Sequence, residues 1–217
     1  NDWQSALVPV YYNLMFAARP YYWGIKTVFT IHNIQYQGQY GREILEYVLG
    51  IDDAHFRSGF MAMDGDVNLM KSAIVASTAV TTVSPTYAQE IQTAYYGHRL
   101  DSVLRSNNYK LHGILNGIDM KTLDPMTDPA LFTNYGPKKP KGKLENKLKL
   151  LELCELSGDE NVPVIGMVSR FADHKGFDLL EAVLDDLLQD DIRLIVLGKG
   201  EWRYEQMFFE AKRRYPD

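Results

Sequence analysis

The stretch TVFTIHNIQYQG, residues 27–38, decides the fold that we predict for this chain. Its first five residues are β-branched or aromatic and uncharged, which is the pattern of a strand inside a parallel sheet. His32 and Asn33 follow the strand directly. Because ligands of open α/β sheets bind beyond the carboxyl ends of the strands, this imidazole and carboxamide are candidates for contact with a substrate. A histidine in this position is, on its own, more often structural than catalytic.

A second strand-turn-helix unit follows in the first half of the chain. Residues 79–83 predict another buried strand. Ser84 or Thr86 can cap the next helix, and Pro85 suits its first turn. Thr86 with Gln89 would form a capping box. The repetition of this unit favours an α/β fold.

Two helices of the first half are predicted from apolar spacing. Asn1 and Asp2 are candidates to cap a helix over residues 3–18, in which Pro9 should produce a kink or mark a restart. Residues 66–76 carry apolar side chains on one face of a packing helix, where we expect Lys71 to have a solvated ammonium and an apolar stem.

The middle of the chain differs in composition. Residues 119–143 contain four prolines and a cluster of lysines near the end, which predicts a connector between lobes with a solvated lysine face. An anionic ligand for these lysines is the lesser alternative. A short strand at 111–115 precedes this segment, and a helix at 144–156 follows it.

The last third of the chain alternates regularly between strands and helices. Apolar strands are predicted at 163–168 and 192–197, and amphipathic helices at 177–188 and 202–215. This order predicts parallel strands joined by right-handed crossovers, which is the opening half of a Rossmann-like domain. The segment Gly198-Lys199-Gly200 lacks the third glycine of a dinucleotide motif and is predicted to be a tight turn.

Two cations stand at the first strand-to-helix turn of this alternation. Arg170 follows the strand, and Lys175 precedes the helix. A guanidinium fork, an ammonium and the free N–H groups of a helix N-terminus can converge on one anion, so a phosphate site is predicted here. The alternative is that both are surface charges beside a loop.

Composition argues against several classes of protein. The 217 residues are 46 % hydrophobic, which suffices for a core. Their formal net charge of −5 offers no basic surface for binding nucleic acid. The chain shows neither a long apolar run nor a signal-peptide pattern, so no membrane partner is expected. Cys154 is the single cysteine, which suits a cytoplasmic protein. The histidines lack metal-ligand spacing, so no metal and no cofactor is expected.

Six short motifs stand along the chain in a defined order. They are Asn1-Asp2-Trp3-Gln4, His32-Asn33 with Tyr36-Gln37-Gly38, Val83-Ser84-Pro85-Thr86-Tyr87-Ala88 with Glu90-Ile91, Leu115-Asn116-Gly117-Ile118-Asp119, Glu145-Asn146-Lys147, and Ser169-Arg170 with Lys175-Gly176. Each is weak alone, but in this order and spacing the chain resembles bacterial glycogen synthases and plant starch synthases over essentially its whole length. The resemblance implies an α/β fold of the GT-B type, with parts of two Rossmann-like lobes whose parallel sheets are flanked by helices.

The resemblance also implies a division of the chain. Residues 1–113 would close the N-terminal, acceptor-side lobe, 114–143 would connect the lobes, and 144–217 would open the C-terminal, nucleotide-sugar-binding lobe. The family's lysine- and glycine-rich donor loop would lie before Asn1, and its glutamate-containing donor segment after Asp217. We therefore expect an internal piece of a synthase, poorly stable and inactive by itself.

The implied reaction is retaining transfer of glucose from ADP-glucose, or from UDP-glucose, to the non-reducing end of an α-1,4-glucan. Arg170 and Lys175 match the family's two cations on the donor diphosphate, and would do the work that Mg²⁺ does in many other phosphate sites. His32 matches the active-site histidine that lies against the donor glucose, with a role in orientation rather than proton abstraction. These three are the catalytic residues that the resemblance implies.

Three further residues match substrate-binding positions of the family. Asp2 and Asn33 would lie near the glucose or the acceptor, and Asn116 at the lobe junction. His174 and Phe171 depart from the usual glutamine and leucine, but neither departure removes a charge. Two alternatives stay open: a related GT-B transferase with another donor or acceptor, and a non-catalytic module that binds glucan or nucleotide.

Overall fold

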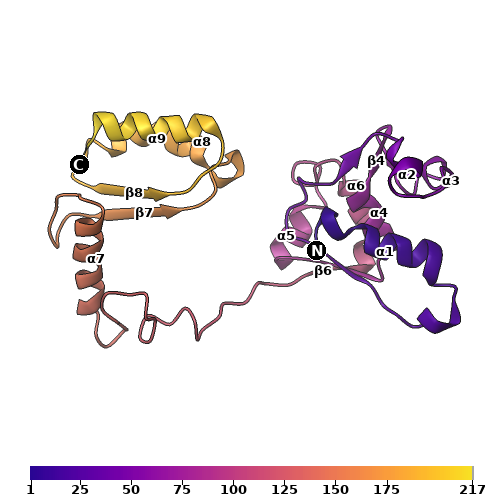
Figure 1. The fold of residues 1–217 in the computed structure, drawn as a ribbon, viewed down its shortest axis with the longest axis horizontal. Helices are drawn as coiled ribbons and strands as arrows, with labels where there is room; N and C mark the ends of the chain where they lie inside the picture. Colours follow the sequence, from indigo (N-terminus) through magenta and orange to yellow (C-terminus); the bar gives the residue numbers. More distant parts are fainter. Residues whose placement is uncertain (217) are drawn as a thin grey trace. The chain divides into compact units, whose positions relative to one another are not determined.

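The computed structural model describes residues 1–216 and divides the chain into two compact units, Asn1–Gly117 and Ile118–Asp217 (Figure 1). Residues 118–143, which we predict to belong to a connector, group with the second unit. They are tied to α7 (Lys141–Leu153), because the Asn146 side chain accepts a hydrogen bond from Phe132 N at 3.0 Å and donates one to Thr133 O at 2.6 Å. The clustered lysines of this segment are exposed, as predicted.

The first unit contains a three-stranded parallel sheet in the order β1-β5-β6. The strands are β1 (Val28–Ile31), β5 (Ala79–Thr82) and β6 (Leu111–Gly113), so the three predicted strands are confirmed. The expectation that β1 lies inside its sheet is wrong for the described residues. It forms an edge, and Val28 is 63 % exposed, whereas Phe29 and Ile31 are buried.

Short helices and a small antiparallel sheet surround these strands, and apolar side chains of α1, α4, β1 and β5 fill the centre. The elements are the 3₁₀ helices η1 (Trp3–Ser5), η3 (Pro20–Tyr22) and η4 (Asn108–Lys110), the π-helix η2 (Tyr12–Phe16), the helices α1 (Leu7–Tyr11), α2 (Ile44–Tyr47), α3 (Ala54–Arg57), α4 (Leu69–Ala76), α5 (Pro85–Glu90) and α6 (Asp101–Ser106), and the strands β2 (Gln39–Tyr40), β3 (Ala62–Met63) and β4 (Asp66–Asn68).

Two predicted helices of this unit differ in extent from the prediction. The segment predicted as helical over 3–18, with a kink or restart at Pro9, is divided into η1, α1 and η2, and Pro9 lies inside α1. The helix predicted over 66–76 begins only at α4, because Asn68 is extended and its Oδ1 caps the helix by accepting from Lys71 N at 2.8 Å.

The expectation of a solvated ammonium at Lys71 is wrong. Lys71 Nζ donates to Gly59 O at 2.7 Å and also to Ala62 O. Burial accordingly lowers the pKa of Lys71. Gly59 lies in the loop between α3 and β3, and Ala62 is the first residue of β3, so the lysine fastens this segment to α4.

The helix after β5 is capped by one of the two predicted candidates. Ser84 Oγ accepts a hydrogen bond from Tyr87 N at 2.9 Å, and Pro85 is the first residue of α5. The predicted capping box of Thr86 with Gln89 is wrong, because both residues lie within the helix that Ser84 caps.

The second unit has the predicted alternation of strands and helices. β7 (Val164–Val168) and β8 (Arg193–Leu197) pair in parallel, and α8 (Phe177–Leu187) and α9 (Trp202–Arg214) both lie on one side of them (Figure 1). The 3₁₀ helix η5 (Asp173–Lys175) precedes α8. The core between helices and strands is aromatic, with Phe171, Phe177 and Tyr204 buried.

The predicted tight turn at Gly198-Lys199-Gly200 is wrong. These residues continue the β7–β8 pairing: Ser169 N donates to Leu197 O, Phe171 N donates to Lys199 O, and Phe171 bridges to Gly200 in parallel. A Cβ on Gly198 would lie 2.0 Å from Ser169 O, and one on Gly200 would lie 2.1 Å from Phe171 O. Both glycines are therefore needed for close backbone approach.

Within residues 1–216, no helix combines the length and the apolar content that crossing a membrane requires. The same residues contain no group of three histidine, cysteine or carboxylate side chains that could hold a metal ion.

Candidate functional site

The loop after β1 carries His32 and Asn33 at the carboxyl edge of the first unit's sheet, as predicted. Asp2 reaches this loop from the start of the chain. Its Oδ1 accepts hydrogen bonds from His32 N at 2.8 Å and from Asn33 N at 3.4 Å, and its own N–H donates to Thr30 O at 2.8 Å. The structure therefore brings together three of the predicted site residues.

Asp2 does not act as the helix cap that we predict from the sequence. Its side chain makes no capping bond to η1, and its backbone has φ 50°, in the left-handed region where a non-glycine residue is strained. The carboxylate holds the loop after β1 instead. Strain of this kind persists where surrounding contacts fix the residue.

His32 and Asn33 keep polar atoms available to a ligand. The His32 side chain is exposed, and its Nε2 lies 3.3 Å from Asn1 Oδ1. Asn33 is half-buried, and its Oδ1 accepts from Gln35 N at 2.9 Å, which shapes the turn. Its amide nitrogen makes no hydrogen bond within residues 1–216. An imidazole and an amide NH₂ at one strand end can both donate hydrogen bonds to hydroxyl groups.

Buried polar contacts hold the rest of this loop in place. Gln37 is buried, donates to His98 O at 2.8 Å and accepts from Asn68 Nδ2 at 2.7 Å. The hydroxyl of Tyr87 accepts from Ile34 N at 3.2 Å, and burial raises the pKa of that hydroxyl. Sequence reasoning placed Gln37 and Tyr87 in motifs without finding these roles, which depend on partners far along the chain.

Gly38 ends the loop against an aromatic ring. It has φ 64°, and a Cβ at this position would lie 2.7 Å from the Trp3 ring. Any other residue would both strain the backbone and displace Trp3. This contact is a physical link between the motif at the start of the chain and the motif after β1.

Asn116 is exposed and follows β6 at the same edge of the sheet. The hydrogen bonding between β5 and β6 extends toward Asn116, because Ile114 N donates to Thr82 O at 2.8 Å. Within the described residues, no hydrogen bond joins Asn116 to His32, Asn33 or Asp2. Its placement at a lobe junction stays a prediction.

Arg170 and Lys175 lie where the second unit's sheet ends. Arg170 is two residues beyond β7, and Lys175 ends η5 directly before Gly176, the N-cap of α8 with φ 77°. Both side chains are exposed, and no ion pair engages either one within residues 1–216. In the same part of the chain no side chain caps α8, so its first N–H groups add donors beside Lys175.

A hydrogen-bonded cluster fixes the turn that carries Lys175. Tyr204 OH donates to Asp173 Oδ1 at 2.6 Å, Arg203 pairs with the same carboxylate, and Asp173 N donates to Glu201 Oε1 at 3.3 Å. The Tyr204 hydrogen bond lowers the pKa of Asp173, and burial raises the pKa of Tyr204 to about 12. Sequence reasoning missed this cluster, which joins residues of η5 and α9.

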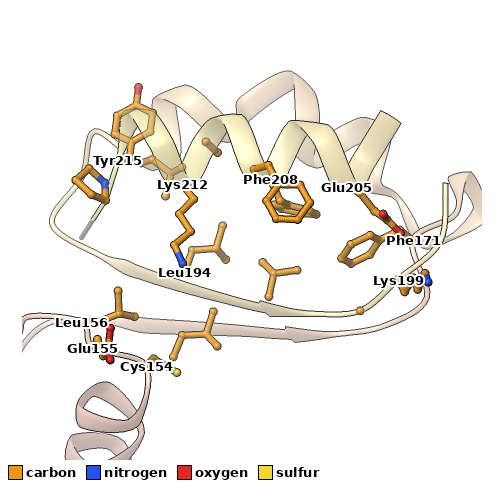
Figure 2. Close-up of a pocket in the computed structure, with 17 residues that line it drawn as sticks. Cys154, Glu155, Leu156, Phe171, Leu194, Lys199, Glu205, Phe208, Lys212 and Tyr215 are labelled. Atoms are coloured by element: carbon orange, nitrogen blue, oxygen red, sulfur yellow. The ribbon is translucent and has the colours of Figure 1, made fainter. Parts of the chain in front are cut away.

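The second unit also contains a pocket of about 570 Å³ between β8 and α9 (Figure 2). Apolar residues such as Leu194 and Phe208 form much of its lining. Neither Arg170 nor Lys175 belongs to it, and Lys199 is the lining residue that lies beside Arg170 in the strand pairing. The pocket is therefore distinct from the predicted phosphate site and adjoins it at Lys199.

Comparison with known proteins finds similarity to glycogen and starch synthases. Residues 1–106 match the family described as the starch synthase catalytic domain. All 217 residues align with glycogen synthases of Desulforamulus reducens at 45 % identity and of Clostridium novyi at 43 %. The chain spans 45 % of the length of each of these relatives.

A solved structure agrees with these relatives. The catalytic domain of starch synthase IV from Arabidopsis thaliana, bound to ADP and acarbose, matches with a TM-score of 0.89 and 33 % identity. The match covers 99 % of this chain and 44 % of that chain.

Proposed function

Because this chain belongs with the glycogen and starch synthases, we propose that the protein carrying it transfers glucose, with retention, from ADP-glucose to the non-reducing end of an α-1,4-glucan. The observation that carries the proposal is the position of His32 and Arg170 beyond the carboxyl ends of parallel strands, with Lys175 in the turn that follows and all three side chains exposed. That edge is where open α/β sheets bind ligands. The proposed architecture is GT-B, with the two units as parts of its two lobes.

Arg170 and Lys175 bind the donor diphosphate in this proposal. The bond between glucose C1 and the phosphate oxygen breaks, and negative charge grows on the departing ADP. Two cations and the N-terminus of α8 stabilise that charge, which lowers the barrier. The C1 carbon forms its new bond with the acceptor 4-hydroxyl oxygen, whose proton passes to the leaving phosphate.

His32 and Asn33 orient the glucose by hydrogen bonds, and Asp2 holds their loop in position. Orientation of this kind contributes by keeping the reacting atoms in near-attack geometry. Asn116 is assigned to substrate binding from the resemblance alone.

The test is transfer of labelled glucose from ADP-glucose and from UDP-glucose to glycogen by the protein that carries this chain, without added metal. His32→Ala and Lys175→Ala should each lower kcat/KM by about 100-fold or more, because each removes a preorganised contact to the transition state. His55→Ala and Lys212→Ala are matched controls on α3 and α9 and should keep most activity.

Three outcomes would overturn the proposal. Full activity in both site variants would show that His32 and Lys175 take no part in catalysis. Transfer from another donor or to another acceptor alone would indicate a related transferase. Glucan binding by the wild-type protein without turnover would indicate a non-catalytic module.

A further inference from the structure

Lys199 lies directly opposite Arg170 in the extended β7–β8 pairing. Val168 pairs with Leu197, and Phe171 bridges to Gly200, so the register is the same before and after these residues. Arg170 and Lys199 are therefore paired positions on neighbouring parallel strands, about 4.8 Å apart across the sheet. This register places the backbones of the two residues side by side at the end of the sheet, and both side chains are exposed.

The backbone at Lys199 is held firmly. Phe171 N donates to Lys199 O at 3.0 Å, and the flanking glycines pack against the Ser169 and Phe171 carbonyls, where no side chain fits. The backbone of Lys199 is therefore held in a fixed position beside Arg170. Its side chain is exposed, and its ammonium has no ion-pair partner within residues 1–216.

Three carboxylates close to this end of the sheet are engaged elsewhere. Glu205 Oε1 accepts from Gly200 N at 3.0 Å, and Glu201 accepts from Asp173 N and pairs with Arg203 at 3.6 Å. Asp173 itself is occupied by Arg203 and Tyr204.

Arg170, Lys175 and Lys199 therefore stand at one end of the sheet, and none of them has an acidic partner within the described residues. Cations gathered without ion-pair partners at one end of a sheet repel each other unless an anion neutralises them. A multiply charged anion is the ligand that such a group favours.

We propose that Lys199 is a third cation of the nucleotide site and contacts the donor diphosphate together with Arg170 and Lys175. This inference rests on the proposed function, because it assumes that the anion is a nucleoside diphosphate sugar. The product ADP carries more negative charge than ADP-glucose once the glucosyl bond has broken. Lys199 should therefore strengthen ADP binding more than donor binding, and lower the barrier to departure.

The test is calorimetric binding of ADP and of inorganic pyrophosphate to the protein that carries this chain. Lys199→Met should weaken both by about 3- to 10-fold, the usual effect of one exposed charge near an anion. Lys199→Arg should restore affinity, because it keeps the charge. The salt dependence of ADP binding should be shallower in Lys199→Met than in the wild type.

Lys212→Met is the matched control. Lys199 and Lys212 both line the pocket in Figure 2, and only Lys199 is in register with Arg170. The control should bind ADP as the wild type does. Equal losses in the two variants would place the nucleotide in the pocket rather than at the sheet end, and would overturn the proposal.

The remaining outcomes separate the two proposals. Wild-type affinity for ADP and pyrophosphate in Lys199→Met would overturn the role of Lys199 and leave the proposed function intact. Weakened binding of ADP with unchanged pyrophosphate would place the contact on the nucleoside and also overturn that role. Absence of ADP binding by the wild type would overturn both proposals.

Discussion

Asp2 is the residue on which the position of His32 depends most directly. Its carboxylate accepts from two consecutive N–H groups of the loop after β1, and it does so from a strained backbone conformation. A hydrogen bond to a charged acceptor contributes about 1.5–3 kcal/mol. Strain at one residue costs about 1–3 kcal/mol, so two such bonds are enough to keep Asp2 in place.

Asp2→Ala should lower kcat/KM for glucosyl transfer by about 10- to 100-fold, because the loop loses that acceptor. Asp2→Asn keeps an oxygen at the same place and tolerates a positive φ, so it should keep most activity. In a His32→Ala background, Asp2→Ala should cost much less, since Asp2 acts through His32. Additive losses in the double variant would contradict this positioning role.

At the scale of elements, the sequence predicted regular segments better than their connections. The boundaries of β7, α8, β8 and α9 lie within about one residue of the prediction. In each of these elements the pattern of apolar residues is regular along the whole segment. The positions of His32 and Arg170 at the sheet edge were predicted for the same reason, since each follows from the strand before it. These are the parts that local pattern determines.

The connections depend on partners that no local pattern reveals. The Lys71 ammonium donates hydrogen bonds to carbonyl groups of a distant segment, and the Gly198–Gly200 segment is extended because residues 169–171 pair with it. The Asp2 carboxylate likewise bonds a residue 30 positions away in sequence. Hydrogen bonds across such distances are set by tertiary packing, which a single sequence does not reveal.

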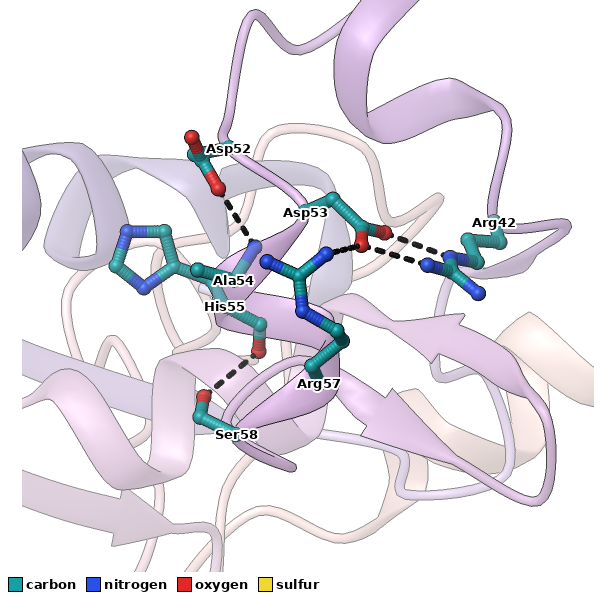
Figure 3. A network of polar contacts seen from close by, with 7 residues as sticks. All are labelled: Arg42, Asp52, Asp53, Ala54, His55, Arg57 and Ser58. Carbon is teal, nitrogen blue, oxygen red and sulfur yellow. Dashed lines mark hydrogen bonds and ion pairs between the residues drawn. The ribbon is translucent and has the colours of Figure 1, made fainter.

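The loop around α3 provides an element-scale test with a defined pH dependence. The Asp53 carboxylate lies between Arg42 and Arg57 (Figure 3). Its Oδ2 is 2.6 Å from Arg42 Nη2 and 2.5 Å from Arg57 Nη1. The hydrogen bond from Arg42 is the largest cause that lowers the pKa of Asp53 below its ordinary 3.8. The stabilisation is therefore present at neutral pH and is lost as pH falls through the folded-state pKa.

Asp53→Asn should lower the melting temperature at pH 7 by a few degrees at most, because the ion pairs are exposed. The difference from the wild type should shrink as pH falls below about 4. Asp52→Asn is the control: Asp52 Oδ1 accepts from Ala54 N at 2.7 Å, and an asparagine oxygen can do the same. A difference for Asp53→Asn that persists at about pH 3 would argue against the ion pairs as its source.

At the scale of the whole molecule, each sheet leaves apolar surface uncovered. Val28 lies on an edge strand, and Val168 and Leu197 are 80 % and 67 % exposed at the ends of β7 and β8. Within the described residues, the parallel sheets have three strands in the first unit and two in the second. Parallel sheets are normally covered on both faces, so these surfaces favour association with other chains.

The 217 residues produced alone should therefore self-associate and show no glucosyl transfer, whereas the protein that carries them should be active. Size-exclusion chromatography with light scattering, beside the transfer assay, measures both.

Val168→Lys should reduce association, because a charge on the exposed sheet face opposes stacking of apolar surfaces. Val28→Lys applies the same change to the edge of the other sheet and separates the contributions of the two units. A sharp monomer peak with transfer activity would contradict this prediction. It would show that the exposed apolar surfaces do not cause association, and that His32, Arg170 and Lys175 suffice for transfer within this chain.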